Sequence, residues 1–252
     1  MKTIAVYNNK GGVGKTVTTV NMAYELSQKG YRVLVIDMDL QGNVSLFFKR
    51  YDLNKTSVAD LLKGTTPSRC RRRTSYKGID IVASNIDLRT VSAESLVAGR
   101  DTLNKALKAY ESLYDYCIID CPPGADFIIE VIMATVEDVI IPLKSDRFSI
   151  NGLETVLDII YAFADPRVHT GCLFTQFYRN RETVGLVQNV IRTTDVMVYD
   201  NLIRRCAAVD HSLRVQRPLA KCASRSTATQ DYRDFTEEYL EKEDKTWHCL
   251  RA

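Results

Sequence analysis

The chain has 252 residues, of which 45% are hydrophobic and 26% charged, an ordinary globular composition with enough apolar material for a sizeable core. Its 34 basic and 31 acidic residues give a net charge of +3, so bulk charge predicts no nucleic-acid partner, and any such argument must rest on local clusters. No run approaches ~20 consecutive apolar residues, which excludes a membrane-spanning segment, and seven cysteines without C-x-x-C spacing indicate free thiols in a reducing cytosol.

Short apolar runs alternate with longer segments of helical periodicity. The runs that predict buried strands lie at 3–7, 32–37, 79–83, 116–120, 139–143, 172–177 and 196–199. The segments that predict helices lie at 15–29, 92–113, 126–136, 152–163, 183–193 and 227–242. Strands rich in Val and Ile that alternate with helices indicate an α/β fold, a mostly parallel, doubly wound sheet flanked by helices, in a single domain spanning 1–252. Ligands of such sheets bind at the carboxyl ends of the strands.

A glycine-rich loop follows the first predicted strand and precedes the first predicted helix. Residues 8–16 read NNKGGVGKT. Glycines let backbone N–H groups wrap phosphate oxygens, and the helix adds its positive amino end. In such a loop Lys15 reaches the β- and γ-phosphates, and the Thr16 hydroxyl ligates Mg²⁺. Asn9 stands where the general pattern G-x-x-x-x-G-K-[ST] has glycine, and Lys10 is a second lysine that the pattern does not require.

The stretch KGGVGKT resembles the deviant Walker A loop of the ParA/MinD family of P-loop ATPases. The resemblance implies ATP and Mg²⁺ as cofactors and a nucleotide-sandwich homodimer. It also implies that Lys10 reaches across the dimer to the partner's phosphates, where a cation supplied in trans can be worth ~10³–10⁵ in rate. The ATP-binding residues that it implies in this segment are Lys10, Gly11, Gly12, Val13, Gly14, Lys15, Thr16 and Val17.

Three carboxylates follow predicted strands. Asp37 and Asp39 end the run VIDMD, and their period-two spacing puts them on one face or bends them together into the site. Asp120 closes the apolar run YCIID, the Walker B pattern of a residue that holds Mg²⁺ through water. The segment DMDLQGN resembles the family's D-x-D-P-Q-G-N, with Leu40 where Pro is usual; by that match Asp39 orients the attacking water and Asp37 supports the Mg²⁺ shell. The expected catalytic residues are thus Lys10, Lys15 and Asp39, and the expected metal-binding residues Thr16, Asp37 and Asp120.

The second half of the chain resembles the same family more loosely. The segment FSINGL matches a helix start of the family, for which Ser149 or Asn151 is a candidate cap. The resemblance places the adenine contacts near Gln176, Ile203 and Arg204, although Arg204 stands where Pro is common in the family.

Two basic clusters are candidate contacts for nucleic acid. Arg205 falls where ParA-type proteins have a DNA-contacting arginine, and Arg214, Arg217 and Lys221 add charge nearby. Such a surface would bind DNA non-specifically through phosphates; the alternative is a solvated face. Four arginines at 69–73 form the second cluster, which we expect to lie in a solvated loop before the next strand unless it contacts DNA or an acidic partner.

The resemblance implies ATP-dependent DNA partitioning, such as the segregation of a plasmid, chromosome or mobile element. ATP·Mg²⁺ would drive dimerisation and non-specific DNA binding, and a ParB-like partner would stimulate the otherwise slow hydrolysis of ATP to ADP and phosphate. We expect a cytoplasmic, nucleoid-associated protein with no separate amino-terminal DNA-binding domain and no membrane partner. Two alternatives remain open: a MinD-like membrane-positioning ATPase, disfavoured by the acidic carboxyl-terminal segment TEEYLEKED, and a nucleotide-gated regulator with negligible turnover.

Overall fold

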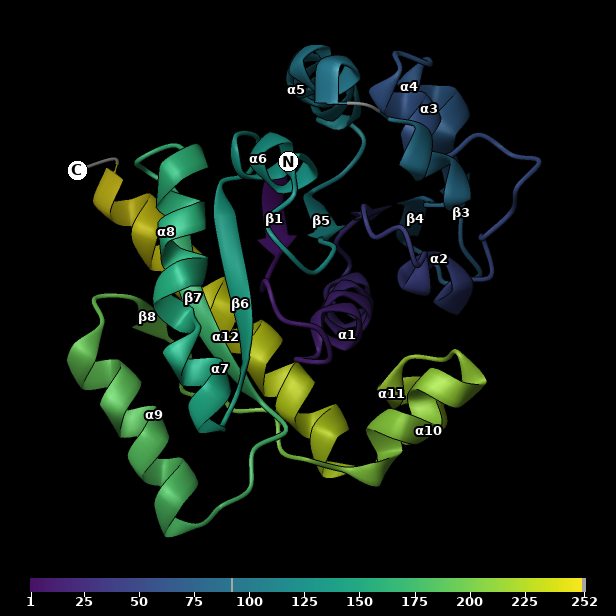
Figure 1. Cartoon of the computed structure of the whole chain (residues 1–252). Coiled ribbons are helices and arrows are strands. Elements are labelled where there is room, and N and C mark those ends of the chain that lie inside the picture. The colour runs from purple at the N-terminus through teal and green to yellow at the C-terminus, as the bar shows by residue number, and fades with distance from the viewer. Residues whose placement is uncertain (92, 251–252) are drawn as a thin grey trace.

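The computed structural model describes residues 1–91 and 93–250, and within them a sheet forms the centre of the molecule (Figure 1). The sheet has eight strands in the order β3-β4-β2-β5-β1-β6-β7-β8. Neighbouring strands are parallel, except that β3 runs antiparallel to β4. The strands are β1 (Lys2–Val6), β2 (Val33–Asp37), β3 (Arg71–Arg73), β4 (Ile79–Val82), β5 (Tyr116–Asp120), β6 (Asp138–Lys144), β7 (His169–Thr175) and β8 (Met197–Val198). The predicted α/β fold is confirmed.

Helices cover both faces of this sheet. They are α1 (Lys15–Gln28), α2 (Asn43–Phe47), α3 (Val58–Leu62), α4 (Pro67–Cys70), α5 (Ala93–Tyr110), α6 (Phe127–Met133), α7 (Arg147–Asn151), α8 (Leu153–Phe163), α9 (Arg181–Thr193), α10 (Ala207–Val215), α11 (Leu219–Cys222) and α12 (Thr227–Leu250), with a 3-10 helix at Ile86–Thr90. Residue 92, where the predicted helix at 92–113 begins, lies outside the described residues. Among those described, no helix is long and apolar enough to cross a membrane.

The sheet separates two hydrophobic cores. Leu34 and Ile119 face the layer of α3, α5, α6 and α8. Val35 and Ile118, their neighbours in the chain, face the opposite layer, which contains α1 and α12. Because successive side chains of a strand point to opposite faces, a strand covered on both sides needs apolar residues at every position. This explains why the central strands read as continuous apolar runs in the sequence.

The strand register brings the sequence motifs to one edge of the sheet. β5 lies between β1 and β2, and Asp120 pairs with Val6 on one side and with Asp37 on the other. Parallel strands end at the same edge of a sheet. The loop that follows β1, the acids that follow β2 and the acid that ends β5 therefore meet there.

The basic cluster at 69–73 differs from the prediction, because it is not a solvated loop. Arg71–Arg73 forms the antiparallel edge strand β3, and Cys70 at the end of α4 is buried. The Arg71 guanidinium donates to the Asp80 carboxylate at 2.8 Å and to the Tyr114 hydroxyl at 3.0 Å. The charge of Arg71 is thus neutralised by Asp80 on the neighbouring strand β4, whereas the sequence pattern alone predicts that this side chain lies in solvent.

The predicted cap near 149–151 is also wrong. Asp146 caps α7, because its Oδ1 accepts a hydrogen bond from the Ser149 backbone N–H at 2.8 Å. The helix that follows, α8, starts from Gly152. The polar side chains of Ser149 and Asn151 lie inside α7, one turn too late to serve as its cap.

Candidate nucleotide-binding site

The loop between β1 and α1 is shaped to bind an anion. Gly12 and Gly14 have φ angles of 70° and 100°, a left-handed conformation that residues with a side chain rarely adopt. Gly14 is also the N-cap residue of α1, and a glycine brings no side chain to the first N–H groups of the helix. Those N–H groups and the positive helix end favour a phosphate at this position.

Lys15 begins α1 and folds back against the loop. Its Nζ donates to the carbonyl oxygen of Asn8 at 2.9 Å and to that of Lys10 at 2.8 Å. Burial lowers the pKa of Lys15, and the negative charge of Asp120 opposes that change. The ammonium group is therefore held beside the glycines, in the place where the sequence predicts contact with the β- and γ-phosphates.

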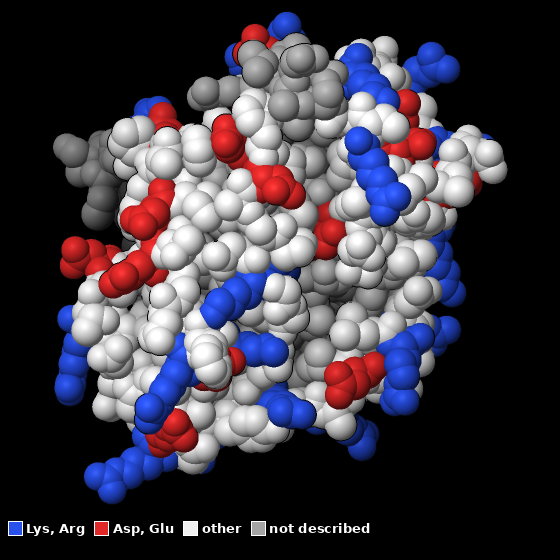
Figure 2. Space-filling model, in the orientation of Figure 1, with Lys and Arg blue, Asp and Glu red and all other residues white. Residues whose placement is uncertain are grey.

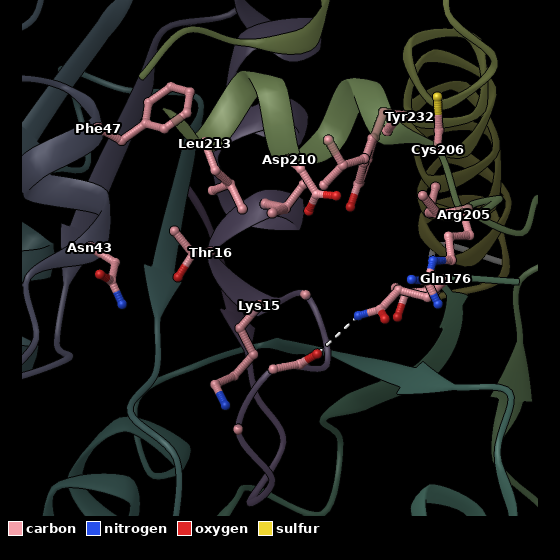
Figure 3. A pocket seen from close by; sticks show the side chains of 18 of the residues that line it. Lys15, Thr16, Asn43, Phe47, Gln176, Arg205, Cys206, Asp210, Leu213 and Tyr232 are labelled. Carbon is pink, nitrogen blue, oxygen red and sulfur yellow. Dashed lines mark hydrogen bonds between the residues drawn. The ribbon is translucent and has the colours of Figure 1, made fainter. Parts of the chain in front are cut away.

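A cavity of about 870 Å³ opens next to this loop, a volume in the range of small-molecule sites. Figure 3 shows the side chains around it, which come from the phosphate loop, α2, α10 and the segment after β7. The predicted residues that line it are Gly11, Gly12, Gly14, Lys15, Thr16, Val17, Asp39, Gln176, Ile203, Arg204 and Arg205. Val13 instead packs inward, and its carbonyl accepts a hydrogen bond from the Thr175 hydroxyl at 2.7 Å.

Thr16 and Asp120 form a corner of the site that fits Mg²⁺. The Thr16 hydroxyl donates to Asp120 Oδ2 at 3.0 Å, and the Thr19 hydroxyl donates to Oδ1 at 2.9 Å. Burial raises the pKa of Asp120, and the charge of the adjacent Asp37 raises it further. A divalent cation would relieve that repulsion, and hydroxyl and carboxylate oxygens are ligands that Mg²⁺ prefers. When bound, the ion would neutralise phosphate charge.

Asp37 and Asp39 occupy different environments. Asp37 is fully buried and accepts hydrogen bonds from the Ser45 N–H at 2.8 Å, the Ser45 hydroxyl at 2.6 Å and the Asp39 N–H at 3.1 Å. Asp39 lines the cavity, and its Oδ1 accepts from the Gln41 N–H at 2.9 Å. Asp37 thus holds the segment that presents Asp39 to the cavity. Its role in the Mg²⁺ shell stays a prediction.

The Lys10 side chain is directed at α7. Its Nζ donates to the backbone carbonyl of Phe148, and it lies against Gly152, where an added Cβ would meet Nζ at 3.2 Å. The Phe148 side chain beside it is 82% exposed. The described residues that line the cavity include Gly11 and Lys15 but not Lys10. In this conformation the second lysine does not serve the cavity of its own chain.

Gln176 lies at the end of the cavity farther from Asn43 and Phe47 (Figure 3), and Arg204 also lines the cavity. Gln176 has a φ of 51°, and its side-chain amide donates to the Gly12 carbonyl at 2.9 Å. The Arg204 backbone N–H and its Nε each donate to the Asp231 carboxylate, at 2.9 and 3.0 Å. Arg204, which stands where Pro is common in the family, therefore forms an ion pair with Asp231 on α12.

One wall of the cavity, which α2 and α10 provide, was not predicted from the sequence. Asn43 and Phe47 from α2, and Asp210 and Leu213 from α10, line the cavity (Figure 3). Val209 also lines it, so the apolar pair at 209 and 213, spaced for one face of a helix, is the signal that could have identified α10.

The predicted DNA-binding residues divide into two groups. The Arg205 guanidinium lies 5.2 Å from the ring centroid of Tyr178 and lines the cavity. Arg214 and Arg217 are exposed at the end of α10, and Lys221 is exposed on α11. These last three residues form a basic surface beside the cavity.

Comparison with known proteins identifies the family. A family model described as an AAA domain matches residues 1–169. The chromosome partitioning protein ParA of Caulobacter vibrioides is 29% identical, over 96% of this chain and 95% of its own. The sporulation initiation inhibitor protein Soj of Bacillus subtilis is 27% identical, over 94% and 97%. The chain belongs to the ParA/MinD family of P-loop ATPases.

A solved structure of the same fold holds an ATP analogue and magnesium. Cobyrinic acid a,c-diamide synthase from Mycobacterium smegmatis, with a bound ATP analogue and magnesium, superposes with a TM-score of 0.83 and is 26% identical, covering 97% of this chain and 96% of its own. As a ParA/MinD-family member, the present chain is an ATPase whose cofactors are ATP and Mg²⁺.

We expect the nucleotide-free ATPase to lose stability as the pH rises from about 5 to about 8. Burial raises the pKa of Asp120 from 3.8 to about 8. A carboxyl whose pKa is higher in the folded state stabilises the fold while it is protonated, and that contribution is lost as the pH passes through the folded-state pKa. Asp120→Asn should therefore melt roughly 5 °C above wild type at pH 8, and the difference should shrink at pH 5. Thermal melts without Mg²⁺ and nucleotide test this; equal melting temperatures at pH 8 would disprove it.

Proposed function

We propose that this ParA/MinD-family ATPase is a DNA-partitioning ATPase that ATP switches between a monomer and a sandwich dimer. The dimer binds DNA non-specifically, and a ParB-like partner stimulates hydrolysis and so releases it. Turnover is slow without that partner. The proposal is supported by the similarity to ParA and Soj along nearly the whole chain and by the separation of the two lysines of the phosphate loop.

The position of Lys10 is the observation that carries the proposal. Lys15 folds back over its own loop, whereas Lys10 extends to the Phe148 carbonyl beside a highly exposed aromatic ring. A cation on that face is available to a second copy of the chain. Phosphoryl transfer builds negative charge that such a cation neutralises. Dimerisation and hydrolysis would then be coupled through one side chain.

Within the cavity each proposed catalytic group has a separate task. Lys15 and the amino end of α1 bind the phosphates, and the Thr16–Asp120 pair holds Mg²⁺. Asp39 faces the cavity from the segment that Asp37 fixes, where it orients the water that attacks the terminal phosphate. Lys10 of the partner subunit completes the site.

The proposed DNA surface predicts ATP-dependent binding that is steeply sensitive to salt. Arg217→Glu should weaken the binding of a non-specific duplex at least tenfold and leave ATP binding unchanged. Arg205 is a poorer choice, because it also lines the cavity and its reversal would perturb both ligands. Fluorescence anisotropy with a labelled duplex, in ATP and in ADP, measures the effect.

The matched control is Arg192→Glu, which makes the same charge change on exposed α9. It should bind DNA as wild type does. If wild type binds DNA equally well in ADP and ATP, or if Arg217→Glu binds as tightly as the control, the proposed function is wrong.

A further inference from the structure

The three arginines of β3 differ in their contacts: two bind other parts of the chain, and one is exposed to solvent. Arg71 is paired with Asp80, and the half-buried Arg72 donates to the Thr56 carbonyl at 3.2 Å. Arg73 is exposed, and its backbone carbonyl accepts a hydrogen bond from Arg50 Nε at 2.7 Å. The edge of the sheet therefore presents Arg73 together with Arg50, and Lys49, next to Arg50 in the chain, is exposed beside them.

An aromatic cluster links this edge to the basic surface of α10 and α11. The Tyr76 ring lies 6.0 Å from that of Phe48 and 5.7 Å from that of Tyr24, centroid to centroid. Lys221 Nζ lies 5.9 Å from the Tyr24 centroid. The Arg217 backbone carbonyl accepts a hydrogen bond from the Cys222 thiol at 3.5 Å, so Arg217 lies beside α11, which carries Lys221. Two basic clusters that are far apart in the sequence thus share one surface.

We call this surface the basic band, and its members are Lys49, Arg50, Arg73, Arg217 and Lys221. In the described part of the chain, none of these five side chains forms an ion pair with an acid. Figure 2 shows Lys and Arg side chains along the right-hand edge of the molecule, from the level of β3 to α10 and α11. Neighbouring cations without acidic partners create a local positive potential, although the net charge of the whole chain is only +3.

We propose that the sheet-edge half of the basic band, Lys49, Arg50 and Arg73, is a second phosphate-contacting segment for duplex DNA. This inference rests on the proposed function and extends the DNA surface beyond α10 and α11. A duplex carries phosphates along its length, so it matches an extended row of cations rather than a single pocket; Lys49 and Arg73 are exposed and Arg50 is half-buried. The segment would position the duplex without reading its sequence, because phosphate contacts carry no base information.

The test is the salt dependence of DNA binding by the ATP-loaded full chain. Lys49→Glu/Arg73→Glu changes two exposed side chains outside the nucleotide cavity. Each phosphate contact contributes about 0.9 to the slope of log K against log salt, so the double variant should lower that slope by about 2 and weaken binding at least tenfold. Anisotropy with a labelled non-specific duplex over a salt series gives both numbers, and phosphate release without DNA should stay unchanged.

Lys108→Glu/Arg192→Glu is the matched control, with the same charge change on α5 and α9. It should keep the wild-type slope. Equal slopes for the two double variants would overturn the inference, even where Arg217→Glu still weakens binding and the proposed function stands. Loss of ATP-dependent DNA binding in wild type would instead refute the proposed function itself. Sedimentation with anionic vesicles tests the alternative that the basic band binds a membrane. If wild type binds the vesicles, and Lys49→Glu/Arg73→Glu loses that binding but binds DNA as wild type does, the inference is also overturned.

Discussion

Replacing Lys10 with alanine should lower the rate of ATP turnover by about a thousandfold and leave ATP binding nearly unchanged. The Lys10 side chain lies on the Phe148 carbonyl, so its removal takes nothing from the cavity of its own chain. The hydrogen bond from Lys15 goes to the backbone carbonyl of residue 10, which alanine retains. The loss should fall on the step in which the partner's cation neutralises the transferred phosphoryl group. Phosphate release measures turnover, and a fluorescent ATP analogue measures binding.

Lys29→Ala is the matched control for this variant. Lys29 lies just after α1, and its Nζ pairs with Glu237 at 2.7 Å on the surface. Exposed pairs of this kind contribute ~0–1 kcal/mol to stability, so turnover should stay at the wild-type rate. Lys10→Ala dimers that hydrolyse ATP normally would show that Lys10 has no catalytic role. Loss of ATP binding in the same variant would show that it acts on the nucleotide of its own chain.

Asp39→Ala should trap the ATP-bound dimer. The structure places Asp39 on the cavity wall, on a segment held by hydrogen bonds to the buried Asp37. Without the carboxylate the attacking water is neither oriented nor activated, and a positioned acid–base group is typically worth 10²–10⁴ in rate. The nucleotide contacts of Lys15 and Thr16 remain, so ATP still drives association. Light scattering after size exclusion should detect a dimer that persists in ATP and disperses only on removal of nucleotide.

Asp39→Asn separates the charge of this residue from its structural role. An asparagine still offers an oxygen to the Gln41 N–H, which Asp39 binds at 2.9 Å, and so preserves the turn. We expect the same slow turnover as in Asp39→Ala. Wild-type turnover in Asp39→Asn would mean that the residue only shapes the loop, and wild-type turnover in Asp39→Ala would remove it from the mechanism.

The parts of the fold that could be predicted are those in which local sequence and tertiary context agree. The run at 116–120 is apolar at each position before its final acid because β5 is covered on both faces, and its predicted bounds match the strand. Gly12 and Gly14 have positive φ angles, and the two glycines in the loop indicate this backbone conformation from the sequence alone. The meeting of Asp120 with Asp37 also follows from the parallel topology.

The parts that could not be predicted depend on partners far away in the chain. Arg71 forms part of a strand because Asp80 and Tyr114 receive its guanidinium, and no local pattern reports that pairing. The approach of Arg217 and Lys221 to the edge near Arg73 depends on how Tyr24 and Tyr76 pack. In the cavity, the wall from α10 was missed because a single apolar pair, at 209 and 213, is the periodic signal of this nine-residue helix, and its function depends on where the fold places it.

Mixing two inactive variants tests most directly whether Lys10 acts across the dimer. Lys10→Ala protein keeps Asp39 but needs a partner's lysine, and Asp39→Ala protein supplies that lysine. In a mixed dimer the nucleotide of the Lys10→Ala subunit would have a complete site. Phosphate release in the first turnover, after equimolar subunits are mixed before ATP is added, should therefore recover to about a quarter of the wild-type amount, because random pairing makes half of the dimers mixed and each has one complete site. A mixture no more active than the two variants measured separately, with mixed dimers present, would contradict action in trans.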